Sequence, residues 1–532
     1  GAVTSRGTRA IRSRGWHGQL QKPKHFVFNS KVAVAKFTQQ KNHMKIHKLF
    51  VANRAEIALR IVRTANRMGI ATVVPCHVRD RFGPALNEAS QTVELVGDPP
   101  VSAWLNSKAL IQAAIETGCD AIHPGYGFLS ENADFARAVA QAGLIFVGPP
   151  ADVIERMGDK ITARNFAVQQ GVPVTPSAEE ESSPETFEQR AASIGFPLLI
   201  KGTAGGGGKG MHIVREASSL PHAIATARAE SLRYFGDGRL LAERFVERPR
   251  HIEVQVFGDS HGHVIHLGER ECSIQRRFQK LIEETPAPTL SKELRQKICQ
   301  AAVDLARAAG YVNAGTVECI VSQTGEFYFL EMNTRLQVEH PVTEMVTGLD
   351  LVEWQLRVAQ GEALPLQQEQ VQWHGSAIEC RILAEDADAG FVPDTGKVLF
   401  LQEPKGPGVR FDNGVMQGAT ISADFDSMLA KLIVHGADRH LAISRLRQAL
   451  QDTVMLGVTL NSDYLRRVLE HPEFQAGGTD TDFLERHKAS LKPLPLTEEE
   501  SRALVAVAAS VSRDPYNTAV NEPFASMGAW RN

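Results

Sequence analysis

Two glutamates near the middle of the chain have a spacing that could hold a metal ion. Residues 316–321 and 326–331 are short runs rich in β-branched and aromatic residues, and the Gly-containing turn Thr324-Gly325 separates them, which predicts a β-hairpin. If that turn is a two-residue loop, Glu318 lies opposite Glu331 with Cβ atoms about 5 Å apart. Two carboxylates this close repel each other unless a cation lies between them, and hard oxygen ligands suit Mg²⁺ or Mn²⁺. The alternative is a pair of solvated glutamates, in a register that could slip by one residue.

A dense polar run follows this hairpin and ends at Pro341. After Glu331 it contains Asn333, Arg335, Gln337, Glu339 and His340. The planar guanidinium of Arg335 suits an oxyanion such as carboxylate, bicarbonate or phosphate, and Glu339 could act as a base beside it. These residue types together predict a site for a metal ion and small anions.

A second candidate site lies in FPLLIKGTAGGGGKGMHIV, residues 196–214. The spacing Gly205-x-Gly207-x-x-Gly210 satisfies the dinucleotide fingerprint, but that fingerprint requires a helix next, whereas residues 211–214 are strand-like. The segment does not match a Walker A loop either. A strand–loop–strand arrangement instead predicts a mobile hairpin whose backbone amides close over phosphates, with charge from Lys201 and Lys209. The alternative is a plain flexible loop.

The elements that must position these residues begin with alternating strands and helices. Strand-like runs occur at residues 47–53 and 71–78 and helix-like segments at 55–68 and 107–117, before two further strand ends at AIHPGYG and LIFVGP. This alternation predicts a parallel sheet with right-handed crossovers, a Rossmann-like lobe that extends to about Pro150. The Gly-rich turn of residues 123–130 places polar groups where such sheets bind ligands.

Further elements follow in the rest of the chain. Lys160 is predicted near the start of a helix, and a smaller α/β unit is predicted at 174–246. Further helices are predicted at 292–309, at 342–361 (a single amphipathic helix) and at 439–453, and strands at 378–383 and 396–401. After Pro493 a short helix followed by coil is predicted. The charges concentrated in residues 268–288 by themselves indicate a solvated face. At 532 residues the chain is long enough for three or four domains.

Composition narrows the class of protein. Hydrophobic residues make up 43% and charged residues 22%, which is typical of a soluble globular protein, and the net charge of −3 gives no indication of nucleic-acid or membrane binding. No apolar run approaches the roughly 20 residues that a membrane span needs. The six cysteines contain no CxxC pair, so we expect a reduced intracellular protein without structural zinc.

Residues 1–43 differ from the rest of the chain. They are rich in Lys and Arg and contain no Asp or Glu, a composition that resembles a mitochondrial presequence. The alternative is a leader that precedes a natural start at Met44. The protein is expected in the cytoplasm, or in the mitochondrial matrix if the segment is a presequence.

A series of spaced motifs then identifies a family. The sequence contains, in this order, FVANRAEIALRI, HPGYGFLSEN, MGDK, IKGTAGGGGKGM, ERECSIQRR, EMNTRLQVEHPVTE and IECRILAED. From residue 46 to about 485 the chain resembles the biotin carboxylase component of biotin-dependent carboxylases, which has an ATP-grasp fold. The resemblance implies an α/β fold with a Rossmann-like N-terminal domain (46–158), an ATP-grasp domain (159–365) with a mobile Gly-rich lid (about 174–246) and an α+β C-terminal domain (374–485), between the basic leader (1–43) and a tail (486–532).

The same resemblance implies roles for individual residues. For ATP it implies Lys160, Lys201, Gly205, Gly206, Gly207 and Gly208 at the phosphates, Glu243 and Val246 at the adenine, His251 near the ribose and Ile320 beneath the base. For two magnesium or manganese ions it implies Glu318 and Glu331, with Asn333 beside them. For bicarbonate it implies Lys280, Arg335, Gln337 and Val338, with Glu339 as the base, and for the enolate of biotin it implies Arg381.

The implied reaction is the ATP- and bicarbonate-dependent carboxylation of biotin through carboxyphosphate, as the first half-reaction of an acyl-CoA carboxylase. Bicarbonate is a poor nucleophile that brings negative charge toward a triphosphate, so metal ions and lysines must neutralise the developing phosphoryl charge. Carboxyphosphate decomposes in water, which gives a closing lid a purpose. The implied partners are a biotin carboxyl carrier domain or protein, a carboxyltransferase subunit, and further copies in a homodimer or larger complex.

Two features of the sequence qualify this expectation. Phe278 occupies a position where the family is expected to have a polar residue, often His, near the nucleotide, so nucleotide affinity is the property in question. The tail resembles the junction in biotin-bearing subunits of the 3-methylcrotonyl-CoA type, but no biotinylation motif of the A/V-M-K-M type occurs, so biotin is expected on a carrier outside this sequence. The alternatives are another ATP-grasp carboxylate ligase and a non-catalytic nucleotide-binding subunit.

Overall fold

The structure is a computed structural model that describes residues 45–180, 185–203, 210–495 and 497–512, without the side chains of residues 235 and 508–512. The described residues belong to one unit. The predicted leader, residues 1–43, lies outside the described residues, as do Gly205, Gly206, Gly207 and Gly208. None of the helices in the described ranges is long and apolar enough to cross a membrane. The six cysteines are free thiols.

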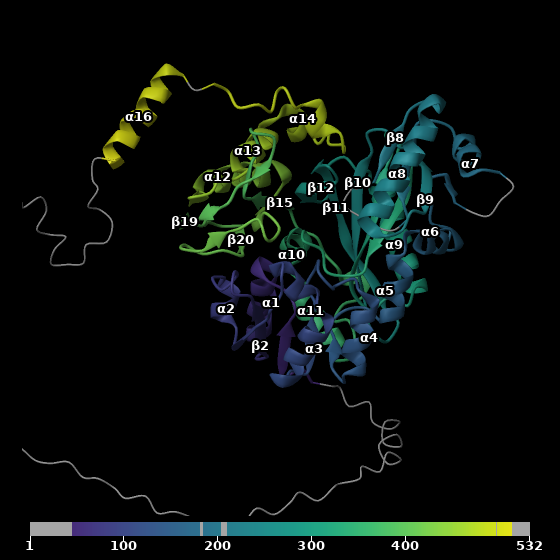
Figure 1. Cartoon of the computed structure of the whole chain (residues 1–532), viewed down its shortest axis with the longest axis horizontal. Coiled ribbons are helices and arrows are strands. Elements are labelled where there is room, and N and C mark those ends of the chain that lie inside the picture. Colours follow the sequence, from purple (N-terminus) through teal and green to yellow (C-terminus); the bar gives the residue numbers. More distant parts are fainter. Residues whose placement is uncertain (1–44, 181–184, 204–209, 496, 513–532) are drawn as a thin grey trace, which may run out of the picture. The chain divides into compact units, whose positions relative to one another are not determined.

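The N-terminal lobe has the predicted parallel sheet. Its strands, in the spatial order β3-β2-β1-β4-β5, are β3 (Gln91–Glu94), β2 (Ala71–Cys76), β1 (Lys48–Val51), β4 (Ala121–His123) and β5 (Ile145–Phe146). The helices α1 (Ala55–Arg67), α3 (Ser107–Glu116) and α4 (Ala133–Gln141) connect them (Figure 1). Parallel neighbouring strands need crossover connections, and the helices between these strands supply them. The Rossmann-like prediction is confirmed.

An eight-stranded antiparallel sheet carries seven of the predicted site residues, namely His251, Lys280, Glu318, Ile320, Glu331, Asn333 and Arg381. In spatial order it consists of β14 (Phe327–Asn333), β13 (Asn313–Val321), β10 (Arg250–Gly258), β11 (Val264–Arg276), β12 (Gln279–Thr285), β15 (Ser376–Leu383), β22 (Met428–Gly436) and β20 (Val409–Asn413). Because β12 pairs with β15, the sheet continues from the predicted ATP-grasp domain into the predicted C-terminal domain. Figure 1 shows β15 beside β12 and β11.

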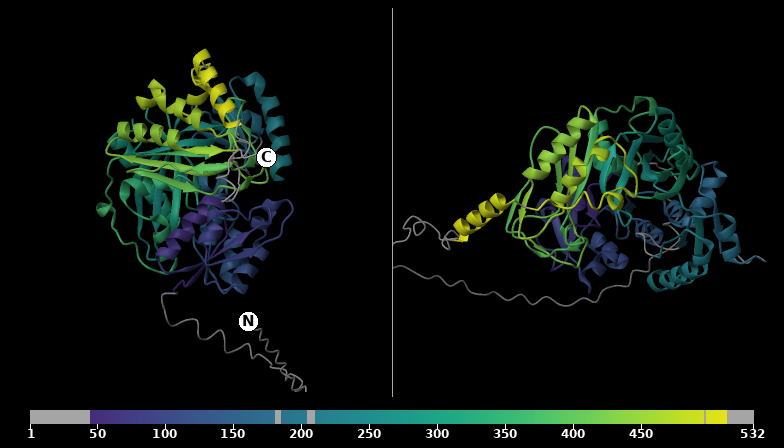
Figure 2. Two further views of the ribbon diagram at one scale, coloured as in Figure 1. Left: turned by 90° about the vertical axis from the view of Figure 1, so that its left-hand side faces the viewer. Right: turned by 90° about the horizontal axis from the view of Figure 1, so that it is seen from above.

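Helices cover this sheet along its length. Helix α9 (Lys292–Ala308) buries Ile298 and Ala302 in the same core as Val254 and Val317 of the sheet. Helices α12 (Arg439–Asp452) and α13 (Ser462–Glu470) pack on the C-terminal strands, as the yellow-green helices in Figure 2 show. A short helix, α10 (His340–Thr347), packs on β15 and β22 through Val342 and Val346. Most of the sheet is therefore buried, and polar groups on its buried parts must find partners inside the protein.

The smaller α/β unit contains the predicted strand–loop–strand hairpin. Its four-stranded sheet has the order β6 (Ser177–Glu179), β9 (Leu240–Arg244), β7 (Leu198–Gly202) and β8 (His212–Val214), and helices α7 (Phe187–Ser193) and α8 (Leu220–Phe235) pack against it. Strand β7 pairs with β8 in the antiparallel sense, so a strand and not a helix follows the glycine run. The glycine run is therefore not a dinucleotide-binding fingerprint, which requires a helix at this point.

Glu318 and Glu331 pair as predicted, but the turn that joins their strands differs from the predicted one. Glu318 is opposite Glu331, but the loop has three residues rather than two, because Ser322 N–H donates to the Glu326 carbonyl at 2.8 Å. Leu330 is then an extra residue between the Cys319–Phe329 and Glu318–Glu331 pairs, and this β-bulge restores the register.

Other predicted elements were wrong in detail. The single helix predicted at 342–361 is two helices, α10 and α11 (Leu351–Ala359), because Gly348 adopts a left-handed φ of 72° and the Asp350 side chain caps α11. The strand predicted at 396–401 is two short strands, β18 (Gly396–Lys397) and β19 (Phe400–Gln402), that pair with different partners. Helices α6 (Lys160–Gln169) and α16 (Glu498–Ser512) lie where helices were predicted.

The charged stretch of residues 268–288 is not a solvated face. Five of its charged side chains are buried in β11 and β12, namely Glu269, Arg270, Glu271, Glu283 and Glu284. They pair with residues of other strands and helices, which a composition argument cannot detect. The burial of so many charges indicates a functional site nearby.

Candidate active site

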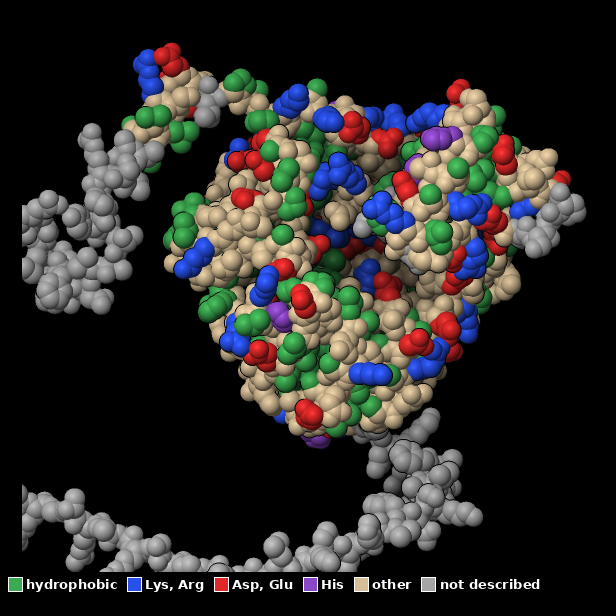
Figure 3. Space-filling view, in the orientation of Figure 1, with side chains coloured by type: hydrophobic (Ala, Val, Ile, Leu, Met, Phe, Trp, Pro, Cys, Tyr) green, Lys and Arg blue, Asp and Glu red, His purple; other side chains and the backbone are tan. Residues whose placement is uncertain are grey.

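One cavity of about 380 Å³ collects the predicted site residues. Its lining includes Lys160, Lys201, Glu243, Val246, His251, Lys280, Glu318, Ile320, Glu331, Asn333, Arg335, Gln337, Val338 and Arg381. Glu339 lies beneath this lining and is fully buried. Figure 3 shows one face of the molecule hollowed at its centre, with Lys or Arg and Asp or Glu side chains inside the hollow. Residues far apart in the sequence are thus brought to one place.

Glu318 is the most heavily bonded carboxylate in the cavity. Its Oε1 accepts hydrogen bonds from Lys280 Nζ, Asn333 Nδ2 and Gln337 Nε2, each at 2.8 Å, and its Oε2 is 2.7 Å from His251 Nε2. Burial alone raises the pKa of Glu318, but the charges of Lys280 and His251 outweigh burial and hold that pKa well below its ordinary value. This carboxylate is therefore ionised.

Glu331, across the hairpin from Glu318, has a different electrostatic environment. Burial and the negative charge of Glu318 raise the pKa of Glu331, while Lys160 opposes the shift. The repulsion expected from the sequence is thus present between the two carboxyl groups. A divalent cation between them would remove it.

Lys280 binds three carboxylates of the site. Its ammonium donates to Glu253 at 2.6 Å and to Glu318 and Glu339 at 2.8 Å each. Burial alone lowers the pKa of Lys280, but the charges of these three carboxylates raise it well above its ordinary value. The lysine therefore carries a fixed positive charge at the bottom of the cavity.

Glu339 lies between two cations. Its Oε1 accepts from Lys280, and its Oε2 is 3.1 Å from Arg381 Nη2. Burial alone raises the pKa of Glu339, but the charges of Lys280 and Arg381 hold it well below its ordinary value. In this arrangement Glu339 is ionised and can accept a proton once a competing anion draws Lys280 away.

Arg335 is held in a fixed orientation by three neighbours. It donates to Glu131 at 2.8 Å, to Gln337 at 2.6 Å and to Asn333 at 3.0 Å. Glu131 also accepts from the Thr334 amide at 3.0 Å. Sequence reasoning missed Glu131, although it lies in the HPGYGFLSEN motif that follows strand β4, at the edge of a parallel sheet where ligands bind.

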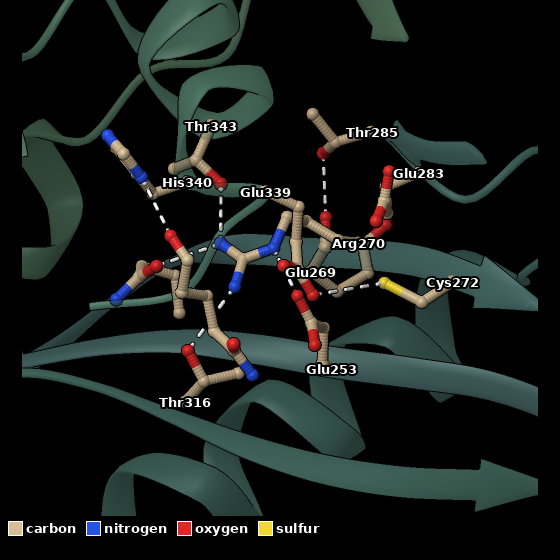
Figure 4. A network of polar contacts seen from close by, with 12 residues as sticks. Glu253, Glu269, Arg270, Cys272, Glu283, Thr285, Thr316, Glu339, His340 and Thr343 are labelled. Carbon is tan, nitrogen blue, oxygen red and sulfur yellow. Dashed lines mark hydrogen bonds and ion pairs between the residues drawn. The ribbon is translucent and has the colours of Figure 1, made fainter. Parts of the chain in front are cut away.

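Two further charged residues that sequence reasoning missed lie below the cavity. Figure 4 shows the Arg270 guanidinium between Glu253, Thr343 and Thr316, with the sulfur of Cys272 directed at Glu339. Arg270 forms a fully buried ion pair with Glu253, and Glu253 also accepts from Lys280. Arg270 and Glu253 therefore support Lys280 from behind the site, and their charged character was the signal available in the sequence.

The other end of the cavity is suited to a nucleotide. Lys201 on β7 forms an ion pair of 2.5 Å with Glu243 on β9, and Arg164 of α6 lies 3.2 Å from the same carboxylate. Burial lowers the pKa of Lys160 at the start of α6. Apolar lining residues, including Val246 and Ile320, provide a surface for a flat ring.

Potential metal-ligand groups lie in the same region. Within the described ranges, His251, Glu253 and Glu318 form one cluster with ligand atoms within 4.8 Å of one another, and Glu253, Cys272 and Glu339 form another. Glu331 belongs to neither cluster. The oxygen donors of Glu318, Glu331 and Asn333 fit Mg²⁺ or Mn²⁺ by chemistry, because hard cations prefer such ligands.

A second cavity, of about 430 Å³, adjoins the first. Gln279, Lys280, Arg335, Val338 and Arg381 line both cavities. The remainder of the second cavity comes mainly from the N-terminal lobe and the C-terminal strands, with Asn53, Arg54, Tyr126, Phe128, Phe425 and Met428 among its residues. The five shared residues thus form a boundary where two ligands could meet.

Phe278 lines the first cavity at the tip of the β11–β12 turn. Its side chain is 53% exposed, and both Arg277 and Phe278 have left-handed φ angles, 49° and 65°. Because Arg276 pairs with Gln279, these two residues form a two-residue turn of the kind that usually contains Asn or Gly. A phenyl ring here supplies no hydrogen bond to a nucleotide.

Comparison with known proteins supports this fold. Residues 45–154 match the family model "Biotin carboxylase, N-terminal domain", residues 159–367 match "Carbamoyl-phosphate synthase L chain, ATP binding domain", and residues 379–486 match "Biotin carboxylase C-terminal domain". The biotin carboxylase of Nostoc is 47% identical over 445 residues, which cover 83% of this chain and 99% of that protein.

Mitochondrial methylcrotonoyl-CoA carboxylase alpha subunits are also similar. The Dictyostelium discoideum subunit is 44% identical over 492 residues, which cover 91% of this chain and 70% of that subunit, and the mouse subunit is 46% identical over 84% of this chain and 63% of that subunit. The chain therefore spans about two thirds of the length of these alpha subunits.

Solved structures of biotin carboxylases are also similar to this chain. The biotin carboxylase domain dimer of Hydrogenobacter thermophilus 2-oxoglutarate carboxylase, in complex with MgADP, ADP and bicarbonate, is 41% identical and superposes with a TM-score of 0.82 over 85% of this chain and 100% of that domain. The Campylobacter jejuni biotin carboxylase–β-γ-ATP complex is 41% identical, with a TM-score of 0.81 over 84% of this chain and 100% of that one. Fold and site define an ATP-grasp protein. The chain belongs to the biotin carboxylase family.

Proposed function

We propose that this chain carboxylates biotin with ATP and bicarbonate, and that the biotin is attached to a carrier. The observation that supports this most strongly is the boundary between the two cavities. There the cations Lys280, Arg335 and Arg381 surround the buried carboxylate Glu339. Such a site has positive charge for two anionic reactants and a base between them.

The larger polar cavity is proposed to hold ATP and bicarbonate. Lys160, Lys201 and glycines 205–208, of which the glycines lie outside the described residues, are proposed to contact the phosphates. Glu243, Val246, His251 and Ile320 are proposed to surround the nucleoside. The Hydrogenobacter structure, which contains ADP and bicarbonate, and the Campylobacter structure, which contains an ATP ligand, support this assignment.

Bicarbonate is proposed to bind to Lys280, Arg335, Gln337 and Val338. An anion that draws the Lys280 ammonium toward itself weakens the hold of that charge on Glu339, and the pKa of Glu339 rises toward the working range of a general base. Glu339 can then take the bicarbonate proton as the bicarbonate oxygen attacks the γ-phosphate. The products of this step are ADP and carboxyphosphate.

Arg381 is proposed to act on biotin in the adjoining cavity. Carboxyphosphate releases CO₂ and phosphate, and that phosphate can take the ureido proton of biotin, so Glu339 need act only once. The negative charge that develops on the ureido oxygen then lies beside a guanidinium that stays protonated at every working pH. Tyr126 and Phe128 offer an aromatic surface for the apolar part of biotin.

Two divalent ions, Mg²⁺ or Mn²⁺, are proposed to bind at Glu318 and Glu331, with Asn333 beside them. When bound, they neutralise charge on the phosphates of the nucleotide during transfer. The charges of Lys160, Lys201 and Lys280 act in the same direction, and Glu253 and Arg270 keep Lys280 in place.

The wider assembly is proposed from the relatives. We propose that the chain supplies the first half-reaction of an acyl-CoA carboxylase of the 3-methylcrotonyl-CoA type, together with a carrier, a carboxyltransferase subunit and a second copy of this chain. The mitochondrial alpha subunits support this choice, and they also favour the mitochondrial matrix over the cytoplasm. The predicted domain limits (46–158, 159–365 and 374–485) remain our proposal, which the three matched ranges support.

The test is ADP release measured with and without bicarbonate, and with and without free biotin, together with fixation of labelled bicarbonate onto biotin. A biotin carboxylase shows both activities. ADP release that depends on another carboxylate indicates a different ATP-grasp ligase. Nucleotide binding without turnover indicates a non-catalytic subunit.

A further inference from the structure

A second pair of glutamates lies directly behind Arg381. Glu283 on β12 and Glu379 on β15 are opposite each other in the antiparallel register, so their side chains share one face of the sheet with Cβ atoms about 5 Å apart. Arg381, two residues after Glu379, projects from the same face. Both glutamate side chains are fully buried.

The two glutamates have very different hydrogen-bond partners. Glu283 Oε1 accepts from Arg381 Nε at 2.6 Å, whereas Glu283 Oε2 and both carboxyl oxygens of Glu379 have no partner among the described residues. A buried carboxylate without a partner is costly, and two of them in one buried site are not both ionised. The arrangement therefore favours one shared proton and one negative charge.

The surroundings of Glu379 leave this proton in place. The charged groups that face Glu379 are Glu283 from β12, Arg381 from its own strand, Lys431 from β22 and Glu339 from the start of α10. Lys431 has other partners, because it donates to the Val338 carbonyl at 2.8 Å and lies 3.3 Å from Glu56 of α1. Burial raises the pKa of Glu379 well above its ordinary value, and it raises the pKa of Glu283 to about 7.

Apolar side chains close the same face of the sheet. Val342 and Val346 of α10 pack with Ala377 and Ile433, the strand neighbours of Glu379. The carboxyl pair is therefore separated from the two cavities by Arg381 and from solvent by the helix. Glu379 lines neither cavity, so any effect it has on catalysis passes through Glu283 and Arg381.

We propose that Glu283 and Glu379 act as a positioning pair for Arg381. Neutral Glu379 supplies the proton donor that Glu283 Oε2 lacks, and ionised Glu283 then holds the guanidinium in one orientation. The inference rests on the proposed function. In that reaction Glu339, the other carboxylate that bonds Arg381, loses its charge when it takes the bicarbonate proton. From that moment Glu283 alone, among the described carboxylates, keeps Arg381 aimed at biotin.

The first experiment compares Glu379→Leu with Glu379→Gln in the full chain, with free biotin as the substrate. Leu removes the donor, so biotin carboxylation should fall about tenfold or more, while bicarbonate-dependent ATP cleavage without biotin changes by less than about threefold. The amide of Gln can donate to Glu283, so this conservative variant should restore most of the carboxylation. Glu283→Gln, which loses the charge that binds Arg381, should resemble Glu379→Leu.

A matched control lies on the same strand. Glu284 is also buried on β12, but it is on the opposite face, where it binds Arg439 at 2.6 Å away from both cavities. Glu284→Gln should leave the ratio of carboxylation to ATP cleavage unchanged. This control separates loss of Arg381 positioning from general damage to β12.

A pH profile gives a second readout that needs only the Gln variant. In the parent, alkaline pH removes the shared proton, so carboxylation should fall at high pH more than ATP cleavage does. Glu379→Gln has no such proton, and this difference should disappear. Identical profiles in parent and variant overturn the proposal.

The remaining outcomes are also decisive. Equal loss of both activities in Glu379→Leu with a lowered unfolding midpoint, or parental activity in both Glu379 variants, overturns the positioning role. A Gln variant as impaired as the Leu variant shows that Glu379 acts as an anion and also overturns it. Absence of biotin carboxylation in the parent chain contradicts the proposed function rather than the positioning pair.

Discussion

Arg381 and Glu339 touch each other, but the reaction needs them at different times. We expect Arg381→Ala to lose biotin carboxylation and keep some bicarbonate-dependent ATP cleavage, because the guanidinium is needed only when charge develops on biotin. Glu339→Gln should lose both activities, because the amide cannot take the bicarbonate proton. The measurement compares ADP release with labelled carboxybiotin in each variant. Normal carboxylation in Arg381→Ala, or parental ATP cleavage in Glu339→Gln, would show that these roles are wrongly assigned.

Glu331 allows a separate test of the metal site. Glu331→Gln removes one charge at nearly constant shape, so most ATP turnover should be lost while the fold is retained. Part of that loss should be recovered at high Mg²⁺ concentration, because a missing ligand weakens metal binding. Bicarbonate-dependent ADP release across a Mg²⁺ titration measures this, and circular dichroism checks the fold. Near-normal turnover at low Mg²⁺ would contradict a site built from two carboxylates.

Sequence reasoning identified the outer residues of this site better than the inner ones. The pairing of Glu318 with Glu331 was predicted correctly although the loop was one residue longer than assumed, because the bulge at Leu330 compensated for the error. A bulge leaves no signal in composition. Glu253 and Arg270 could not be assigned from the sequence, because their partners lie on other strands and only the folded chain brings them together.

At the scale of elements, the β11–β12 turn combines backbone strain with a missing polar group at Phe278. We expect Phe278→His to bind ATP more tightly, since an imidazole N–H can donate where a phenyl ring cannot. A net hydrogen bond of about 0.5–1.5 kcal/mol corresponds to roughly two- to tenfold in Kd. Histidine also accepts left-handed φ more readily than Phe, so stability should not fall. Calorimetric titration measures the affinity, and Phe278→Leu is the control that changes the shape without adding a donor.

The β7–β8 hairpin is the element proposed to close over the phosphates. Amide hydrogen exchange in residues 198–202 and 212–214 should slow when an ATP analogue binds, because a hairpin held by phosphate opens less often. Exchange in α9 is the internal control and should stay constant. Unchanged exchange in the hairpin at saturating nucleotide would show that the hairpin does not close over the nucleotide. Sequence patterns predicted this hairpin correctly, because β-branched residues on both sides of the glycine run allow little else.

The region after Pro341 shows where pattern reasoning fails at this scale. The apolar period continues through residues 342–361, so the sequence indicated one helix. Gly348 and Asp350 carried the contrary signal, since glycine in a left-handed conformation ends a helix and Asp begins the next one. The turn preferences of Gly348 and Asp350 therefore divide the single helix that the apolar period predicts.

At the scale of the whole molecule, one ionic cluster joins three segments of the chain. Arg60 of α1 and Arg410 of β20 both bind Glu344 of α10, at 2.6 and 2.7 Å, and Arg410 also binds Asp412 at 2.7 Å. Arg410→Met leaves the buried carboxylate of Glu344 and the partly buried one of Asp412 with fewer partners, so the free energy of unfolding should fall by about 3–5 kcal/mol. Urea denaturation at neutral pH measures the loss. Arg63→Met, at the exposed pair with Glu88, is the control and should change little.

The same cluster predicts how the protein responds to acid. Burial alone raises the pKa of Glu344, but Arg60 and Arg410 outweigh it, and the pKa of Glu344 is lowered, as is that of Asp412. A carboxyl group with a lowered pKa stabilises the folded state above its unfolded pKa of about 4, and this contribution is lost as pH falls through the folded value. The free energy of unfolding should therefore fall below about pH 4, and less so in Arg410→Met.

The order of the three domains was predictable from spaced motifs, but their connection was not. Strand β12 and strand β15 are separated by about ninety residues, and no local pattern indicates that they pair. Pairing between Glu283 and Glu379, and hence the environment of Arg381, depends on this contact.

The continuous sheet has a consequence for how this protein is inherited. Gene recombination often exchanges segments at exposed linkers, and residues 366–373 look like such a linker between two domains. A break there would leave β12 with a bare edge of unpaired amide and carbonyl groups, which promotes aggregation. It would also part Lys280 and Glu283 from Arg381. The region from β10 to β22, which contains the whole eight-stranded sheet, is therefore expected to be inherited as one piece.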